Sequence, residues 1–430
     1  MKSTAAIEDR ATRFDAGSDL ASCARRAIAI DAARTKLAET ATAAIGEVDV
    51  VRAASERQSP TRSGASLGSG RFAHRAEVVS RALALRRRER VAPRHPQRIL
   101  VAHHLLLGDT LMLTPLVKKL RTRHPDADIA MTLPRAIAPL YATRPYGVRP
   151  IAFDPRDPPS SLFDEPPFDL ALVPGDNRYA WLAAAMRARW IVAFAGDRPR
   201  IKSWQVDQQI PYSTRPGAWG DLVAELVEGP APAPYRVGEW ASPPHAAFER
   251  PADPYAVVHV GASSPLKQWE ASRWRDIAEW LNAQGMRPVW SAGPNETALV
   301  NAIDPDRRFM SFAGRLDLAQ LWALLADAKL VVAPDTGVAH LGRVVGVPTV
   351  ALFGPGSALL CGAGEFWRDA PYRAVTIEAF PCRDQRVLFK RDIVWVRRCG
   401  RGVTQCPEHL CMPAISVGLV QDAIRSLLNR

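Results

Sequence analysis

Two blocks of alternating strand-like and helix-like segments, separated by a proline-rich stretch, constrain the fold of this chain more than any other feature. Short apolar runs typical of buried strands alternate with helical stretches in residues 97–228, and the alternation restarts at residue 255. Between the blocks, residues 229–254 carry seven prolines, a density that prevents regular helices and central strands. Such alternation predicts parallel sheets covered by helices on both faces.

The sequence therefore predicts an α/β protein with two doubly wound, Rossmann-like domains at 97–228 and 255–413, a linker at 229–254 and a C-terminal helix within 414–430. Ligands of such folds bind in a cleft at the carboxyl ends of the strands. The expected strands are 98–104, 128–133, 168–173, 190–194, 255–260, 288–292, 330–333 and 348–353. The expected helices are 110–124, 179–188, 271–284, 296–303, 318–328, 338–345 and 415–428.

Composition excludes several protein classes. With 430 residues, 47% hydrophobic and 23% charged, the chain is neither collagen-like, nor a disulfide-rich miniprotein, nor wholly disordered. The formal net charge of +12 suggests nucleic-acid binding, but residues 1–98 hold 19 basic and 11 acidic residues and so carry most of that excess. Because the remainder is only mildly basic and no DNA-binding module is recognisable, we expect no nucleic-acid partner.

Residues 1–96 form an Ala/Arg/Ser-rich extension that we expect to be poorly ordered or partly helical. A helix with a thin apolar stripe is predicted around 19–44, followed by a Gly/Ser stretch at 59–70 and a basic cluster at 86–90. The main interpretation is a solvated extension; alternatively the cluster touches anionic lipid head groups, or the natural chain starts near Val91. No apolar run approaches the roughly 18 residues of a membrane helix, and acidic residues interrupt any signal-peptide core. We expect a cytoplasmic protein.

Two loops that follow strands of the second block have the residues of an anion site. In residues 261–269 (GASSPLKQW), small residues let backbone N–H groups approach an anion, and Ser263, Ser264 and Lys267 add donors. Residues 333–340 (APDTGVAH) enter a helix whose free N–H groups favour an anion. Each loop also has a structural interpretation: the first as an ordinary turn, the second with Asp335 as helix cap and His340 packed in the core.

A third loop, Gly108-Asp109-Thr110, occupies the same topological position in the first block. Taken alone, Asp109 is best interpreted as a helix N-cap. A carboxylate at the mouth of a cleft can instead act as a general base.

From about Arg98 to Leu428 the chain resembles glycosyltransferase family 9, the heptosyltransferase-like family. The resemblance rests on three ordered motifs: RILVAHHLLLGDTLMLTPLVKKLRTRHPDADIAMTL at 98–133, VVHVGASSPLKQWEASRWRDIAEWLNAQGMRPVWSAGPNE at 257–296, and LAQLWALLADAKLVVAPDTGVAHLGRVVGVPTVALFGPGS at 318–357. The last holds the family's most characteristic pattern, Asp-Ser/Thr-Gly-x-x-His followed by Gly-x-Pro and Phe-Gly-Pro.

The resemblance implies a GT-B fold and an inverting transfer from a nucleotide-diphosphate sugar, ADP-heptose in heptosyltransferases, to the inner core of lipopolysaccharide. It also implies a glycan or glycolipid acceptor as partner. Peripheral contact with the cytoplasmic face of the inner membrane is an alternative that rests on the basic cluster at 86–90. No cofactor is implied, because the loops expected at the cleft carry no Asp-x-Asp motif for a metal.

The same resemblance assigns roles to individual residues. Asp109 matches the family's proposed base, and Glu296 matches the acidic residue that holds the nucleoside. The diphosphate loop is matched by Ser263, Ser264 and Lys267, and the group around the donor sugar and phosphates by Asp335, Thr336, Gly337 and His340. In an inverting displacement the base and the phosphate anchors face each other across the cleft, and Lys267, Thr336 and His340 would stabilise the leaving diphosphate.

The chain departs from the family pattern on the acceptor side. Where many relatives carry Arg or Lys six residues before the aspartate, this chain has His103, followed by His104 and an apolar Leu105-Leu106-Leu107 run that leads to Gly108. Because these residues depart from the family pattern, the sequence does not predict which molecule accepts the sugar. The alternatives are therefore the same chemistry with another nucleotide sugar or acceptor, and a non-catalytic nucleotide-sugar-binding protein. A dehydrogenase is disfavoured because no Gly-x-Gly-x-x-Gly follows either opening strand.

Four of the six cysteines lie near the C-terminus. Cys382, Cys399, Cys406 and Cys411 could bind a metal ion or cluster. Their spacing lacks the usual Cys-x-x-Cys knuckle, so we expect reduced thiols with a structural role and no metal. The arginines among them could equally bind an acceptor phosphate.

Overall fold

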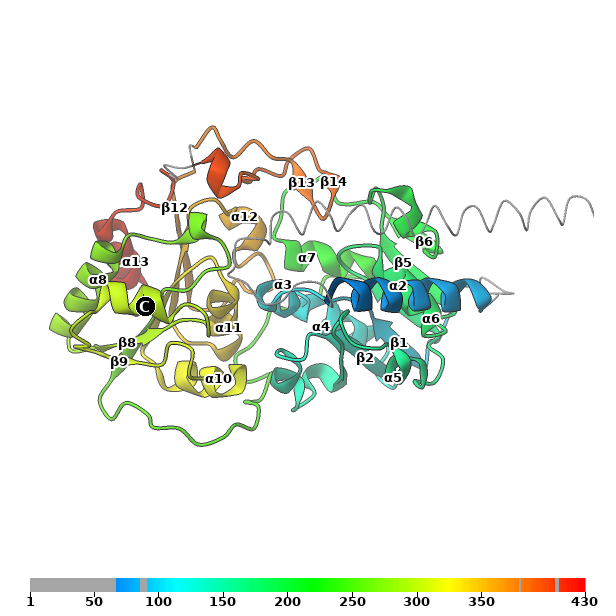
Figure 1. Ribbon diagram of the computed structural model, residues 1–430, viewed down its shortest axis with the longest axis horizontal. Coiled ribbons are helices and arrows are strands. Elements are labelled where there is room, and N and C mark those ends of the chain that lie inside the picture. Colours follow the sequence, from blue (N-terminus) through cyan, green and yellow to red (C-terminus); the bar gives the residue numbers. More distant parts are fainter. Residues whose placement is uncertain (1–66, 86–90, 379, 407–409, 430) are drawn as a thin grey trace, which may run out of the picture. The chain divides into compact units, whose positions relative to one another are not determined.

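The structure is a computed structural model that describes residues 67–85, 91–378, 380–406 and 410–429, all within one compact unit of the chain (Figure 1). The helix expected at 19–44 and the basic cluster at 86–90 lie outside these residues. The described residues form two six-stranded parallel sheets with helices, which confirms the predicted α/β class. No helix in this part of the chain combines the length and apolar character needed to cross a membrane.

The first sheet has the strand order β3-β2-β1-β4-β5-β6, and with its helices it forms what we call the N-lobe. Its strands are β1 (Arg98–Val101), β2 (Asp128–Leu133), β3 (Val148–Ala152), β4 (Leu170–Val173), β5 (Trp190–Phe194) and β6 (Gln208–Ile210). Its helices are α3 (Leu107–Leu111), α4 (Thr114–Arg123), α5 (Ser160–Phe163), α6 (Tyr179–Ala185) and α7 (Trp219–Val223), with 3-10 turns η1 (Ala138–Tyr141), η2 (Pro145–Gly147), η3 (Arg200–Ser203) and η4 (Ala224–Leu226).

The single helix expected at 110–124 is wrong, because α3 and α4 are separate. Pro115 lies in the first turn of α4 and has no N–H to donate to the carbonyl of Leu111. The hydroxyl of Thr114 donates to that carbonyl instead, at 2.6 Å. The break ends α3 after one turn and leaves Asp109 on a short helix that projects from the end of β1.

The second sheet, with the order β12-β11-β10-β7-β8-β9, repeats the topology of the first and forms the C-lobe. Its strands are β7 (Tyr255–His259), β8 (Arg287–Ser291), β9 (Met310–Ser311), β10 (Leu330–Pro334), β11 (Thr349–Phe353) and β12 (Tyr372–Thr376). Its helices are α8 (Ala271–Ala283), α9 (Thr297–Ile303), α10 (Leu318–Asp327), α11 (Gly337–Val345), α12 (Ala358–Cys361) and α13 (Val417–Leu428), with η5 (Pro265–Lys267) and η6 (Val403–Gln405).

In both sheets the strand order reverses between the first and the fourth strand, at β1/β4 and at β7/β10. Doubly wound sheets bind ligands in the crevice at this switch point, beyond the carboxyl ends of the strands. All three loops singled out in the sequence follow β1, β7 or β10, so the topology places them at the two switch points.

Part of the N-terminal extension is helical, in agreement with the prediction, but this helix packs on the N-lobe and is not the solvated segment that the main interpretation expected. Helix α2 (Leu67–Ala84) packs on α6, and Val79 and Ala82 are buried. Arg81 fixes the contact, since its Nε donates to the carbonyl of Ala185 at 3.1 Å and its guanidinium lies 4.4 Å from the centroid of the Phe163 ring.

Residues 229–254 contain no helix or strand and pack against both lobes. The hydroxyl of Tyr235 donates to the carbonyl of Val344 at 2.8 Å, and the indole N–H of Trp240 donates to the carbonyl of Leu140 at 3.2 Å. The domain boundaries drawn from the sequence stay a prediction.

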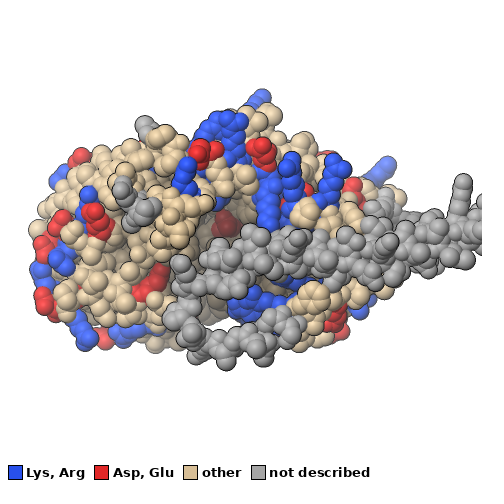
Figure 2. All heavy atoms as spheres, turned by 45° about the horizontal axis from the view of Figure 1, so that its top comes forward, with Lys and Arg blue, Asp and Glu red and all other residues tan. Residues whose placement is uncertain are grey.

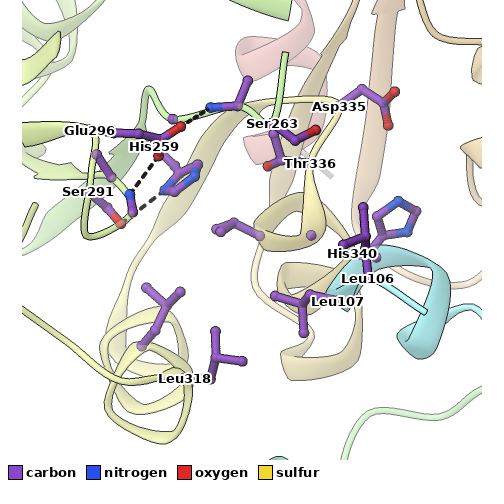
Figure 3. A pocket seen from close by; sticks show the side chains of 18 of the residues that line it. Leu106, Leu107, His259, Ser263, Ser291, Glu296, Leu318, Asp335, Thr336 and His340 are labelled. Carbon is purple, nitrogen blue, oxygen red and sulfur yellow. Dashed lines mark hydrogen bonds between the residues drawn. The ribbon is translucent and has the colours of Figure 1, made fainter. Parts of the chain in front are cut away.

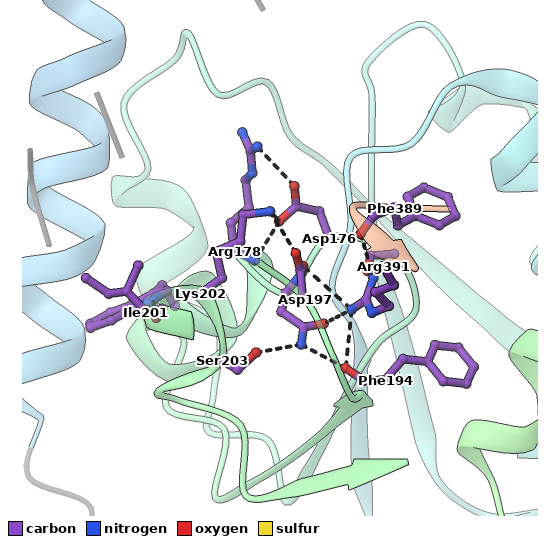
Figure 4. A network of polar contacts seen from close by, with 12 residues as sticks. Asp176, Arg178, Phe194, Asp197, Ile201, Lys202, Ser203, Phe389 and Arg391 are labelled. Carbon is purple, nitrogen blue, oxygen red and sulfur yellow. Dashed lines mark hydrogen bonds and ion pairs between the residues drawn. The ribbon is translucent and has the colours of Figure 1, made fainter. Parts of the chain in front are cut away.

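A segment that the sequence did not predict as a structural unit, residues 380–399, crosses between the lobes, and we call it the strap. Two buried arginines, Arg383 and Arg391, fix it, and Figure 4 shows the second of them. Arg383 donates to the carbonyls of Phe353 and Gly354 at the end of β11. Arg391 lies in a small hairpin of β13 (Val387–Leu388) and β14 (Arg391–Asp392) and enters the N-lobe. There it donates to the carbonyls of Gly175, Phe194 and Ala195 and to the amide oxygen of Asn177.

The final helix, expected at 415–428, packs on the C-lobe and does not make the crossing to the N-lobe. Helix α13 packs on α8, β11 and β12, and Val420, Ile424 and Leu427 are buried in the core of the C-lobe. The strap makes the crossing instead.

Candidate active site

A cavity of about 400 Å³ opens at the carboxyl ends of β7, β8 and β10 and extends to the start of α3 in the N-lobe (Figure 3). Residues from all three predicted loops line it, which brings together chemistry that the sequence had placed more than 200 positions apart. The predicted site residues that line it are Gly108, Asp109, Ser263, Lys267, Glu296, Asp335, Thr336, Gly337 and His340.

Glu296 ties together the loops after β7 and β8. One carboxylate oxygen accepts from the backbone N–H of Ala262 at 2.8 Å, and the other accepts from the N–H of Gly293 at 2.7 Å. Gly261 lies so close that a Cβ there would be 2.0 Å from a Glu296 oxygen. Glycine is therefore required at residue 261 by the close approach of this carboxylate.

Cationic and backbone donors meet at the start of α11. The ammonium of Lys267 lies 2.9 Å from a carboxylate oxygen of Asp335 and also donates to the Asp335 carbonyl at 2.7 Å. One of its three N–H donors thus remains for a ligand. Thr336 is the N-cap of α11 but its side chain accepts no capping bond, and its buried Oγ1 has no partner among the described residues. The free N–H groups of this helix turn make it a candidate anion site.

The cap interpretations of the two aspartates are wrong. The N-cap of α3 is Leu106 and that of α11 is Thr336, so neither Asp109 nor Asp335 occupies a capping position. Asp335 is held by Lys267, and Asp109 makes no hydrogen bond within the described part of the chain.

The N-lobe loop at 107–109 is in direct contact with the start of α11. A Cβ on Gly108 would lie 2.9 Å from Cδ2 of His340, and a Cβ on Gly337 would lie 2.8 Å from the Leu107 side chain. The two glycines allow α3 to approach α11, and this approach places Asp109 across from the anion site.

The environment of Asp109 raises the pKa of its carboxyl from 3.8 to about 6. Burial is the main cause and neighbouring Asp335 adds to it, whereas the positive charges of Lys267 and Arg398 oppose it. Arg398 belongs to the strap, where the next residue, Cys399, donates its N–H to the carbonyl of Pro355 at 3.1 Å. A carboxyl with a pKa near 6 is mostly ionised at neutral pH and is matched to general-base work.

One end of the cavity has an apolar wall that sequence reasoning missed. The wall is formed by Phe312, Leu316, Leu318 and Leu321. Opposite it, Nδ1 of His259 lies 3.1 Å from the hydroxyl of Ser291, and burial lowers the pKa of this imidazole to about 4. The only sequence signal for His259 was its position at the end of a strand, directly before the glycine loop. An apolar slot with two polar groups suits a nucleoside.

Three predicted residues lie outside the cavity lining. The hydroxyl of Ser264 accepts from the N–H of Leu266 and caps η5. His103 is buried, its Nδ1 accepts from the N–H of Leu105 at 3.2 Å, and burial lowers its pKa to about 3. His104 packs edge-on against Phe153, with ring centroids 5.7 Å apart.

The strap adds positive charge beside this region. Six of its residues are lysine or arginine and two are aspartate. Basic side chains gather along one edge of the hollow on the face shown in Figure 2.

The four C-terminal cysteines are near one another. Burial raises the pKa of the Cys411 thiol, and the neighbouring Cys382, Cys399 and Cys406 raise it further. All four are free thiols, and no three His, Cys, Asp or Glu side chains form a metal-binding group within the described ranges. Metal binding by these cysteines stays a prediction.

Comparison with known proteins relates the chain to one enzyme family. The sequence model described as "Glycosyltransferase family 9 (heptosyltransferase)" matches residues 165–374. Lipopolysaccharide heptosyltransferase 1 of Pseudomonas aeruginosa is 28% identical over 230 residues, which are 47% of this chain and 64% of that protein. Lipopolysaccharide heptosyltransferase 3 of Escherichia coli is 24% identical over 65% of this chain and 89% of its own length.

A similar fold is found among solved structures. The ADP-heptose lipopolysaccharide heptosyltransferase II of E. coli superposes with a TM-score of 0.58 and 18% identity, over 77% of this chain and 98% of that structure. At 18% identity this similarity shows a shared fold, the GT-B fold, and nothing more.

Proposed function

Because residues 165–374 match the model of glycosyltransferase family 9 (heptosyltransferase), we propose that the chain is a member of this family and transfers a sugar, with inversion, from a nucleotide-diphosphate donor to a hydroxyl of a glycan acceptor. The observation that supports this most directly is that Asp109, a carboxylate without a hydrogen-bond partner in the described part of the chain, lies across one cavity from the anion site at the start of α11. The two halves of a displacement reaction are thus on opposite walls.

The donor would lie along the C-lobe. Its nucleoside fits the apolar slot of Phe312 and Leu318 beside His259, and its diphosphate fits the N–H groups after Thr336 and the remaining donor of Lys267. As the diphosphate leaves, its growing negative charge meets donors that are already in place, which lowers the barrier. We propose that Glu296 keeps the slot open, because both of its oxygens bond the loops that frame it.

The acceptor would approach from the N-lobe. Ionised Asp109 takes the proton of the attacking hydroxyl, which then attacks the sugar opposite the diphosphate. The names of the relatives support ADP-heptose as donor and the lipopolysaccharide core as acceptor. Such an acceptor would bind at the cytoplasmic face of a membrane. At the diphosphate, the positive charge of Lys267 would take the place of a metal ion.

The test combines calorimetry with turnover. Titration with ADP, GDP and UDP should show a preference for ADP, and ADP-heptose should be consumed when a core acceptor is added. Asp109→Asn should abolish turnover and leave ADP affinity unchanged. A preference for GDP or UDP would keep the glycosyltransferase and discard ADP-heptose, while wild-type-like turnover of Asp109→Asn would remove Asp109 as base.

A further inference from the structure

Arg343 lies on α11, three residues after His340, and is 1% exposed. No carboxylate lies within ion-pairing distance of it in the described part of the chain. Its guanidinium donates to the carbonyl of Gly362 and lies 4.8 Å from the ring centroid of Tyr372 and 5.7 Å from that of Trp367. Carbonyls and aromatic faces thus surround this charge, and the carboxylates that act on it, Asp335 and Asp221, do so from beyond ion-pairing distance.

A buried arginine without a carboxylate is costly, because the desolvation of an ion amounts to several kcal/mol even after the protein relaxes. Neutral carbonyls and ring faces recover only part of that cost. A hydrophobic side chain at residue 343 would fill the same space between aromatic rings without it. Packing alone therefore does not explain an arginine here.

Besides a long bond to the carbonyl of Cys361 at 3.5 Å, the guanidinium of Arg343 donates a hydrogen bond to Nδ1 of His340. A guanidinium has donors only, so Nδ1 must present its lone pair, and the proton of the neutral imidazole is then on Nε2. The other edge of the ring faces the N-lobe: a Cβ on Gly108 would lie 3.3 Å from Nε2. Nε2 has no hydrogen-bond partner among the described residues, and His340 lines the cavity (Figure 3).

We propose that Arg343 is a positioning residue that fixes His340 as the Nε2–H tautomer. The Nε2–H group is then aimed at the donor diphosphate. When the diphosphate binds, its negative charge balances the buried guanidinium charge behind the ring. The inference rests on the proposed function, in which the diphosphate lies at the start of α11. His340 then acts as a neutral donor, since burial, Arg343 and Lys267 all lower its pKa.

Loss of Arg343 should weaken the binding of the phosphates and leave the binding of the nucleoside unchanged. Arg343 touches neither the apolar slot nor the loops held by Glu296, so its loss should spare adenosine binding. Binding of ADP should weaken about 10-fold or more in Arg343→Met, as expected when a hydrogen bond to a charged group is lost. Arg343→Lys, which keeps a positive donor, should retain more of the ADP affinity than Arg343→Met.

The experiment measures adenosine, AMP and ADP affinities by calorimetry for wild type, Arg343→Met and Arg343→Lys. Arg121→Met is the matched control, because Arg121 donates to the backbone carbonyls of Tyr146, Pro125 and Ala127 and does not line the cavity. A loss confined to ADP, absent in the control, supports the proposal. An unchanged ratio of ADP to adenosine affinity in Arg343→Met overturns it.

Two readouts distinguish failure of this proposal from misfolding of a variant and from failure of the proposed function. Long-range nitrogen–proton NMR on protein with ¹⁵N-labelled histidine, with His340→Gln to assign the signal, reports the tautomer in the wild type itself. An Nδ1–H or charged His340 at neutral pH overturns the proposal even where Arg343→Met does not fold. If wild type binds adenosine and ADP equally well, the proposed donor site fails instead.

Discussion

Replacement of Asp109 by asparagine should stabilise the protein while it removes the proposed base. The pKa of this carboxyl rises from 3.8 to about 6, which corresponds to about 3 kcal/mol against the ionised form in the folded state. Solvent reaches the half-buried carboxylate and reduces this penalty, so we expect a gain of about 2 kcal/mol in the unfolding free energy of Asp109→Asn at pH 7.5. Asparagine keeps the shape and cannot ionise.

The pH dependence gives the sign of the effect. The folded-state pKa lies above the unfolded value, so the contribution of Asp109 to stability is fully present below about pH 4 and is lost as pH rises through about 6. The difference in stability between Asp109→Asn and wild type should therefore be near zero at pH 4, grow between pH 4 and 6, and level off above.

Urea unfolding at several pH values between 4 and 8 measures this difference. Asp306→Asn is the control, because it makes the same substitution at an exposed aspartate. A constant difference across the range, or a loss of stability in Asp109→Asn at pH 7.5, would refute the reasoning that burial governs this carboxyl. Reaction rates should fall below pH 6 for the same reason, since the base becomes protonated.

Three further predictions concern the cavity and the strap. Lys267→Ala should weaken ADP binding by about 1.5–3 kcal/mol in calorimetry and spare adenosine; equal affinities would remove Lys267 from the phosphate site. Gly261→Ala should abolish nucleoside binding, because the new Cβ would lie 2.0 Å from a Glu296 oxygen, whereas Gly402→Ala, with open space around it, should bind normally. Arg391→Met should make the strap sensitive to limited proteolysis, since its bonds to the N-lobe are lost; an unchanged digestion pattern would contradict its role in fixing the strap.

The strands and loops that could be predicted are those with a local signal. The runs at 128–133 and 190–194 are short and mostly apolar, and they match β2 and β5. The loops at 108–110, 261–269 and 333–340 were found because small residues follow such runs, and the switch-point topology brings them together.

The rest depends on contacts that no local pattern encodes. Arg391 meets Asn177 across 214 positions of sequence, and nothing near either residue indicates the other. The same holds for Arg343, which looks like one more polar residue on a helix until Tyr372 and Trp367 are seen to enclose it. The roles of the site residues, unlike the fold, remain proposals that the experiments above address.

The strap and the linker together limit how the lobes can move. A body joined to another at one point can swivel in any direction, whereas attachment at two separated points leaves one easy rotation, about the line through both. Here one attachment is the chain at 229–254 and the other is the strap, whose Arg383 grips β11 while Arg391 enters the N-lobe. Any rotation of one lobe against the other that keeps both attachments would therefore run about the line that joins them, and it would carry Asp109 toward or away from the start of α11.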